Sequence, residues 1–563
     1  MSLNKFTSDI IQDSLISIGE AMFETIQRTS MSPIIYEALD YAVGITDGEG
    51  RLLAQGNGVI TFLAAMSLVV EETLKRFGDN NPLKEGDVII ANTPYLGGGT
   101  HLSDIAIITP IFYKKERVAF TVNKAHWTDI GGTNPGSVST VSTEIYQEGI
   151  HFPFIKVREE GKINDAVLKI LEANVRLPKS TLGDLFSGIA ANDVGAERII
   201  KLIDKYGLKA YKQAAKEFME YGERISLKEL QKIPNGTYEN TGYIENDGFG
   251  NGPFPIKLKI IIKDNEMVCD FTGTHKQLKG PLNLSRTGLE TAVRAAFKSI
   301  TTPTLPANNG SFKHVKLICP ENTVVSANSP APISVYYEVF LAAIDLLLKT
   351  LGPIVPEKLP AGHFRSVCVT YISGLHPVTN EFYVQAEPLS GGWGANAFND
   401  GNRGQFSYSH GESYNIPAET RERKYGVMVE EYCFHNEGGG YGEFQGGNGQ
   451  YLVFKVLSKE AFLTGAFLGY SIPTWGLNEG YDGSYNYFTV IRTDGNEEKY
   501  NVVTNIKLNK GDRVKLVTAT GGGYGNPDKR PIKKIKKDIK NGYITEEQAL
   551  KNYKHFSNEV IKS

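Results

Sequence analysis

The spacing of hydrophobic residues changes character along the chain. Apolar residues recur at helical spacing over 7–29, which predicts an amphipathic first helix. Two strand-like runs then flank Asp47-Gly48-Glu49-Gly50, a sequence typical of a hairpin turn. The pattern next predicts a helix, followed by three strands (residues 62–77, then 88–93, 104–112 and 117–125).

The middle of the chain is predicted to be mostly helical. One short and two long helical patterns follow one another, and the long ones are charged on their outer faces, as in a helical arm (residues 163–175, 182–206 and 208–231). Strand-like alternation returns in the sequence IKLKIIIK, and two more helices are expected beyond it, over 289–301 and 335–351.

The second half of the chain is rich in strands and glycine. Short strands alternate with glycine loops from 368 to about 519, and a basic helical tail follows, in which Thr545 and Gln548 form an N-cap signature. These patterns predict an α+β fold: a large multilayered body with mixed β-sheets, a helical arm in the middle and a β-rich, glycine-rich C-terminal half. Five regions are expected: 1–155 with the metal site, 156–234, 235–367, 368–525 and 526–563.

Composition narrows the classes of function. The 563 residues are 41% hydrophobic and 22% charged, which is ordinary for a soluble globular protein, and the net charge of −3 gives no basic surplus for nucleic acid. The chain contains no run of about 18 apolar residues, so no membrane-spanning helix is predicted. Acidic residues interrupt the apolar positions of the N-terminus, which is not the pattern of a signal peptide. The four cysteines lie far apart, as expected for reduced thiols in a cytoplasmic protein.

Histidine and aspartate gather between residues 95 and 154, although the whole chain has only ten histidines. His101 and Asp104 lie in a polar turn between the glycine loop 97–99 and a β-branched run, and His126 ends another strand-like run. Imidazole and carboxylate together form a ligand set that suits Zn, Mn or Fe. The alternative is that His101 caps a loop and Asp104 accepts bonds from nearby backbone N–H groups.

Longer sequence blocks carry a family resemblance. They are ALDYAVGITDGEGRLLAQ, NTPYLGGGTHLSD, KAHWTDIGG, TEIYQEGIHFP, NVRLP, GDLFSGIAAN, DFTGTHKQLKGPLN, EGGGYGEFQGGNG and GGGYGNP. In these blocks the chain resembles the B-type (beta) subunit of the hydantoinase, 5-oxoprolinase and acetone carboxylase family, and is N-methylhydantoinase B-like. The resemblance implies a divalent metal held by Asp40, His101, Asp104 and His126.

Three more residues are catalytic candidates. The resemblance places Glu148 and His151 near the metal, although both also suit an ordinary loop. Asp129 follows His126 by three residues, so it either orients an imidazole or caps the turn at Gly131 and Gly132. A polar, glycine-rich stretch over 390–419 is expected to line a substrate pocket and contains Asp400, Arg403 and His410.

The remaining glycine loops do not indicate a nucleotide site. Gly438–Gly449 and Gly521–Pro527 lack the G-x-x-x-x-G-K-[ST] pattern, and no such pattern occurs elsewhere in the chain. They are expected to form turns and close backbone contacts between strands. The resemblance instead implies that ATP and Mg bind to a separate A-type partner subunit.

The resemblance implies the metal-binding catalytic subunit of an ATP-dependent cyclic amidohydrolase of the hydantoinase/oxoprolinase type. The partner would activate the substrate by phosphorylation, and the metal would supply Lewis acidity. Three alternatives remain open. They are a subunit of an ATP-dependent ketone carboxylase (acetone/acetophenone type), which resembles longer chains, a structural subunit whose metal only staples loops, and a stand-alone metal-dependent hydrolase.

Overall fold

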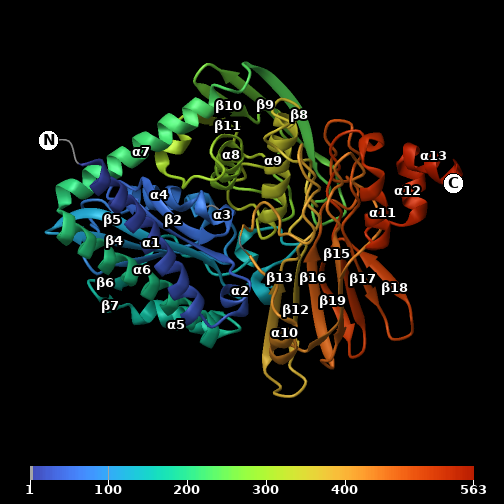
Figure 1. The fold of residues 1–563 in the computed structure, drawn as a ribbon. Helices are drawn as coiled ribbons and strands as arrows, with labels where there is room; N and C mark the ends of the chain where they lie inside the picture. Colours follow the sequence, from blue (N-terminus) through green and yellow to red (C-terminus); the bar gives the residue numbers. More distant parts are fainter. Residues whose placement is uncertain (1–3, 99, 412, 563) are drawn as a thin grey trace. The chain divides into compact units, whose positions relative to one another are not determined.

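The computed structural model describes residues 4–98, 100–411 and 413–562, so Gly99 of the predicted glycine loop lies outside the described residues. The chain divides into two compact units, whose helices and strands are labelled in Figure 1. Unit 1 contains Met1–Thr237, Lys259–Tyr336 and His410–Tyr414, and unit 2 contains Tyr238–Leu258, Tyr337–Ser409 and Asn415–Ser563. The predicted mixed α and β fold with several sheets is confirmed. The division into five regions stays a prediction.

A seven-stranded sheet forms the core of unit 1. Its order is β2-β1-β5-β4-β3-β6-β7, and the predicted hairpin turn at Asp47 joins β1 to β2. The strands are β1 (Tyr41–Asp47), β2 (Leu52–Gly58), β3 (Val88–Ala91), β4 (Asp104–Tyr113), β5 (Glu116–His126), β6 (Ile155–Glu159) and β7 (Lys162–Ile163).

Helices cover this sheet, and every residue of β1 is buried, as expected for a strand inside two apolar layers. Helices α1 (Lys5–Thr29) and α6 (Pro178–Tyr206) contact each other and the sheet, and the predicted first helix is confirmed. Gly188 of α6 permits a close approach, since a Cβ there would lie 2.5 Å from the side chain of Ile107. Side chains of α3 (Ile60–Leu63) and α4 (Met66–Arg76) join the apolar cluster formed with Phe120 and Val122.

The single helix predicted over 62–77 is wrong, because the chain forms the two helices α3 and α4 with a break at Ala64 and Ala65. The carbonyl oxygen of Ala64 accepts a hydrogen bond of 3.3 Å from the guanidinium of Arg294. At this break a side chain from α8 (Arg286–Thr301) satisfies one carbonyl group that the helix leaves without an intrahelical partner.

The helices predicted for the middle of the chain are confirmed as α5 (Asp165–Asn174), α6 and α7 (Leu208–Leu230), and α6 and α7 pack against α1. A second sheet has the order β11-β10-β9-β8. Its strands are β8 (Gly236–Ile244), β9 (Phe254–Lys263), β10 (Glu266–Asp270) and β11 (Val315–Ile318).

Unit 2 contains the β-rich half with two more sheets, of order β13-β12-β16-β19 and β14-β15-β20-β17-β18. Helices α9 (Tyr336–Leu351) and α10 (Ala418–Lys424) accompany them. The strands are β12 (Val369–Leu375), β13 (Phe382–Glu387), β14 (Val427–Phe434), β15 (Gln450–Val456), β16 (Glu460–Ala466), β17 (Tyr487–Ile491), β18 (Glu497–Tyr500), β19 (Val502–Asn509) and β20 (Arg513–Val517).

The glycine loops of unit 2 pack backbone against backbone, as predicted. The N–H of Gly521 donates to the carbonyl of Gly447, whose own N–H donates to the carbonyl of Trp393, each over 2.9 Å. A Cβ on Gly447 would lie 1.9 Å from the carbonyl oxygen of Asn402. Neither loop opens an α-helix, since Gly438–Gly449 leads into β15 and the other loop leads into a single 3₁₀ turn. These contacts agree with a structural role for the glycines.

The basic tail forms α11 (Ile532–Lys540), α12 (Glu546–Asn552) and α13 (Lys554–Lys562), and the predicted cap is confirmed. Thr545 and Gln548 form a reciprocal capping box at the start of α12. The fully buried Arg530 precedes α11 and donates to Asp400 and to Asp538 over 2.7 Å each. This cation therefore links the tail to the loop that contains Asp400.

Replacing Arg530 with Met should destabilise unit 2 by about 3–5 kcal/mol, because two carboxylates would lose their shared cation. The measurement is urea unfolding together with limited proteolysis of the tail. Lys529→Met removes a neighbouring exposed cation and should change neither result. A wild-type unfolding curve for the Arg530 variant would show that the ion pairs contribute little.

Candidate metal centre

The register of the first sheet brings the predicted metal ligands into one row. Strands β1, β5 and β4 are neighbours, and Asp104 at the start of β4 lies directly opposite His126 at the end of β5. The N–H of His126 donates to the backbone carbonyl of Asp40, just before β1, over 3.0 Å. His101 lies one turn before β4, and its carbonyl accepts the N–H of Asp104. Three adjacent strand ends and one turn thus supply the four residues.

A β-bulge sets this register. Near the turn Tyr113 pairs with Glu116, but the pairing shifts between Ile111 and Phe112, where β5 contains one extra residue. Without that shift Asp104 would lie opposite Ala125. Because neighbouring residues of a strand point to opposite faces, His126 and Asp104 would then point apart.

Three ligand atoms converge at the site. His101 Nε2 lies 3.1 Å from Asp104 Oδ1 and 3.1 Å from His126 Nδ1, and His126 Nδ1 lies 3.2 Å from Asp104 Oδ1. Two ligands at right angles, each about 2.1 Å from a metal ion, lie about 3.0 Å apart. Among the described residues this is the one group of three or more His, Cys, Asp or Glu with such spacing. The donor set therefore fits a divalent metal ion.

Charge and burial also favour a cation here. All three side chains are buried, and Asp104 Oδ2 accepts no hydrogen bond from the described residues. Burial alone would raise the pKa of Asp104, but His101 and His126 hold it well below its usual range, so this carboxylate stays ionised. An ionised, buried oxygen with a remaining lone pair is a suitable metal ligand.

Asp40 differs from the other three. Its side chain does not belong to the converging group, although it interacts electrostatically with both His126 and Asp104. It is partly accessible by surface area, yet the surrounding protein desolvates it and raises its pKa to about 7. Leu39, immediately before it, has a φ of 59°, an unusual conformation for leucine that directs the chain into β1. Its role as a fourth ligand stays a prediction.

The ring of His101 is held in one orientation. His101 Nδ1 donates to the backbone carbonyl of Ser334 over 2.9 Å, because a carbonyl oxygen can only accept. In the neutral imidazole this leaves the lone pair of Nε2 facing Asp104 and His126. The ring of Tyr336 lies 5.0 Å from the ring of His101 and completes the wall on this side.

Glu148 is buried, but its hydrogen bonds go to another segment of unit 1. It accepts the N–H groups of Ile333 and Ser334 over 3.0 Å each and the hydroxyl of Ser142 over 2.7 Å. Burial raises the pKa of Glu148 to about 7. Glu148 therefore reaches the metal site through the backbone that contacts His101.

Asp129 and His151 have local contacts. Asp129 accepts the backbone N–H groups of Gly131 and Gly136 and a guanidinium N–H of Arg176, each over 3.0 Å. These contacts match the turn-capping alternative. His151 is half-buried with its ring 5.4 Å from that of Tyr146, and burial lowers its pKa. Catalytic roles for both residues stay predictions.

Two buried residues near the site were not identified as site residues from the sequence. Lys124 lies two residues before His126 on the same face of β5, and its ammonium donates to the carbonyl of Gly98. The position of Lys124 inside an apolar, strand-like run was the feature of the sequence that could have identified it. His410 is buried in unit 1 and interacts electrostatically with His126 and Asp104. The sequence predicted that His410 belongs to a polar stretch lining a substrate pocket, but nothing local links residues 410–414 to unit 1 and the metal ligands.

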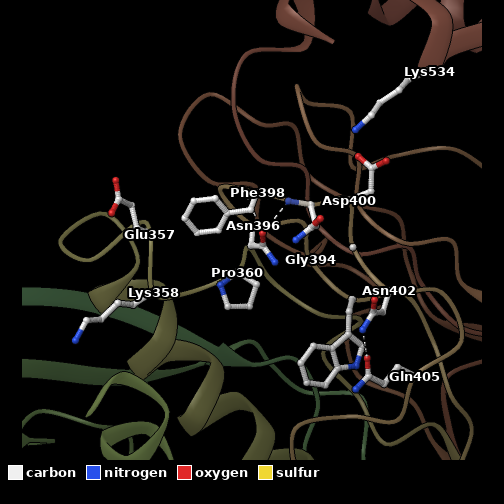
Figure 2. A pocket seen from close by; sticks show the side chains of 13 residues that line it. Glu357, Lys358, Pro360, Gly394, Asn396, Phe398, Asp400, Asn402, Gln405 and Lys534 are labelled. Carbon is white, nitrogen blue, oxygen red and sulfur yellow. Dashed lines mark hydrogen bonds between the residues drawn. The ribbon is translucent and has the colours of Figure 1, made fainter. Parts of the chain in front are cut away.

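Residues between 393 and 405, part of the polar stretch predicted over 390–419, line a hollow of about 670 Å³ in unit 2. Figure 2 shows Phe398 and the amide side chains of Asn396, Asn402 and Gln405 around it, and Trp393 also lines it. Arg403 points elsewhere, to the ring of Tyr543 and the side chain of Asn448. The prediction that this stretch lines a pocket agrees with the hollow, and a substrate role stays a prediction.

Comparisons with known proteins relate this architecture to one family. The family model described as Hydantoinase B/oxoprolinase matches residues 4–527. An uncharacterized protein of Methanocaldococcus jannaschii is 35% identical over 98% of this chain and 96% of its own length. A putative B-type subunit of a D-/L-hydantoinase from a Pseudomonas species is 29% identical, over 98% and 95%.

The fold is shared with a solved enzyme structure. The crystal structure of the ATP-dependent caprolactamase from Pseudomonas jessenii matches with a TM-score of 0.92 and 27% identity, over 98% of this chain and 96% of that chain.

Among the described residues no helix has the length and apolar character needed to cross a membrane.

Proposed function

Because the chain belongs to the Hydantoinase B/oxoprolinase family, we propose that it is the metal-binding catalytic subunit of an ATP-dependent enzyme that opens cyclic amides. The convergence of His101, Asp104 and His126, with 3.1–3.2 Å between ligand atoms, carries the proposal. The names of two relatives, a hydantoinase subunit and an ATP-dependent caprolactamase, support the substrate class. A cytoplasmic location belongs to the same proposal.

The need for ATP follows from the chemistry of the substrate. An amide carbonyl is a poor electrophile, so phosphorylation of its oxygen would prepare it for attack. This chain has no P-loop sequence, and neither the loop Gly438–Gly449 nor the loop Gly521–Pro527 opens an α-helix. An A-type partner subunit would therefore bind Mg-ATP and phosphorylate the substrate. The name of the hydantoinase relative, which describes one subunit of an enzyme, supports such a partner.

The residues of the metal site would have different roles in the hydrolysis of the activated amide. His101, Asp104 and His126, with Asp40, would hold a divalent metal ion, namely Zn, Mn or Fe. When bound, such an ion supplies Lewis acidity and lowers the pKa of water. The Ser334 carbonyl keeps the lone pair of His101 Nε2 directed into the site. His410 is buried and interacts electrostatically with His126 and Asp104, and burial lowers its pKa to about 4, so its ring stays uncharged near neutral pH.

Reconstitution tests this function. The chain and its partner, purified separately and then mixed, should release ADP in the presence of a hydantoin, 5-oxoproline or a lactam, and only when both subunits and a metal are present. The isolated chain should show no binding of Mg-ATP by calorimetry.

Other outcomes would select the alternatives. Amide hydrolysis by the chain alone without ATP would indicate a stand-alone hydrolase, and ATP use with a ketone and bicarbonate would indicate a carboxylase. Full turnover after removal of the metal would make the metal structural. Tight binding of Mg-ATP by the isolated chain would contradict the division of labour.

A further inference from the structure

Two segments of unit 1 that are far apart in the sequence are joined beside the metal site. Ser334 Oγ donates to the carbonyl of Ser139 over 2.6 Å, and the N–H of Ile145 donates to the carbonyl of Pro330 over 3.0 Å. Glu148 adds the bonds to Ile333 and Ser334 described above. The segment 330–334 is therefore held by residues 139–148.

The bonds of Glu148 continue to a metal ligand. Its carboxylate accepts the N–H of Ser334, and the carbonyl of the same residue accepts Nδ1–H of His101 over 2.9 Å. The position of this carbonyl fixes both the tautomer and the orientation of the His101 ring. A shift of the 333–334 backbone would thus move His101 Nε2 relative to Asp104 and His126.

The groups around the Glu148 side chain are hydrogen-bond donors. Three donors point at it, namely two backbone N–H groups and the hydroxyl of Ser142. Oε1 accepts from all three donors, and Oε2 also accepts from the N–H of Ile333, so the NH₂ group of a glutamine in the same position would lie against that N–H group. Glu148 is 2% exposed, and a buried carboxylate without a cation costs free energy. This cost suggests that Glu148 has a function in addition to packing.

We propose that Glu148 is a positioning residue for the metal, acting through the Ser334 carbonyl on His101. The inference rests on the metal site of the proposed function. In this proposal Glu148 does not take part in catalysis directly, as the sequence suggested, but holds the metal ligand His101 in its position. Groups that hydrogen-bond directly to a metal-bound histidine, as the Ser334 carbonyl does here, contribute about 10- to 100-fold to metal affinity. Glu148 acts on that carbonyl through the N–H of the same residue, so its loss should weaken metal binding by up to that amount.

The test compares Glu148→Gln with Glu144→Gln, which makes the same change at an exposed position of the same loop. Affinities of the isolated chain for Zn and Mn are measured by competition with a chromophoric chelator, and melting temperatures are measured with and without metal. Glu148→Gln should weaken metal binding by up to about 100-fold. It should still fold, because the Ser139–Ser334 and Ile145–Pro330 bonds remain. Glu144→Gln should match the wild type.

Wild-type metal affinity in Glu148→Gln would overturn the inference, whether or not turnover falls. Should this variant fail to fold, Ser142→Ala removes one donor to the carboxylate. It should weaken metal binding several-fold, and an unchanged affinity would equally overturn the inference. The outcome is independent of ATP chemistry. A chain that binds metal through this relay yet shows no ATP-dependent hydrolysis would refute the proposed function alone.

Discussion

His101→Ala is expected to abolish metal binding and turnover while the protein stays folded. The variant loses one of three converging ligand atoms and the bond from Nδ1 to Ser334. Metal affinity should fall by more than about 100-fold, since even the partners of a ligand contribute 10- to 100-fold. The hydrophobic cores of both units lie elsewhere, so the melting temperature of the metal-free protein should change little.

Metal content by mass spectrometry and melting temperature are measured on the same sample. His275→Ala, the same change at an exposed histidine, is the control and should retain metal and activity. Normal metal content in His101→Ala would remove this residue from the site. Loss of the fold would assign the metal a structural role.

Gly521→Ala is expected to destabilise unit 2 by about 3 kcal/mol or more, or to prevent its folding. An added Cβ would lie 2.0 Å from the carbonyl oxygen of Trp393 and 2.6 Å from the N atom of Gly394. Both are backbone atoms, so rotation of a side chain cannot relieve the clash. Moving the backbone would break the bond from Gly521 N–H to the carbonyl of Gly447.

Urea unfolding and the soluble yield after expression measure this effect. Gly78→Ala is the control, because a Cβ at Gly78 meets no atom within 4 Å. If Gly521→Ala unfolds at the wild-type urea concentration, the glycine loops tolerate side chains and their close packing has been overestimated.

The sequence predicts much of this site, because its ligands lie at the ends of strongly apolar strands. The runs that become β4 and β5 could be recognised, and so could the histidines and aspartate at their ends. The register could not, since the extra residue of β5 near Phe112 decides whether Asp104 faces His126 or Ala125. A bulge depends on packing against neighbouring strands as well as on local sequence.

Local sequence patterns also could not predict the contacts between segments that are far apart in the chain. The bond from Ser334 to Glu148 spans 186 residues, and no periodicity links the two positions. The same holds for His410, whose short segment belongs to unit 1 while its flanking residues belong to unit 2. The hydrogen bond from Arg294 to Ala64, at the interruption between α3 and α4, spans 230 residues. The sequence thus predicted most helices and strands, and it pointed to His101, Asp104 and His126 as metal ligands. The side chains and backbone groups that surround these ligands could be identified only from the three-dimensional structure.

The most direct test of the metal centre is an anomalous diffraction map of the metal-loaded chain, recorded at the absorption edge of the bound ion. One peak per chain is expected, about 2.0–2.3 Å from His101 Nε2, Asp104 Oδ1 and His126 Nδ1. A fourth contact from Asp40 would establish the complete ligand set. A metal-loaded crystal with no peak between these three atoms, and with His101 and His126 hydrogen-bonded to Asp104 alone, would contradict the proposed metal centre.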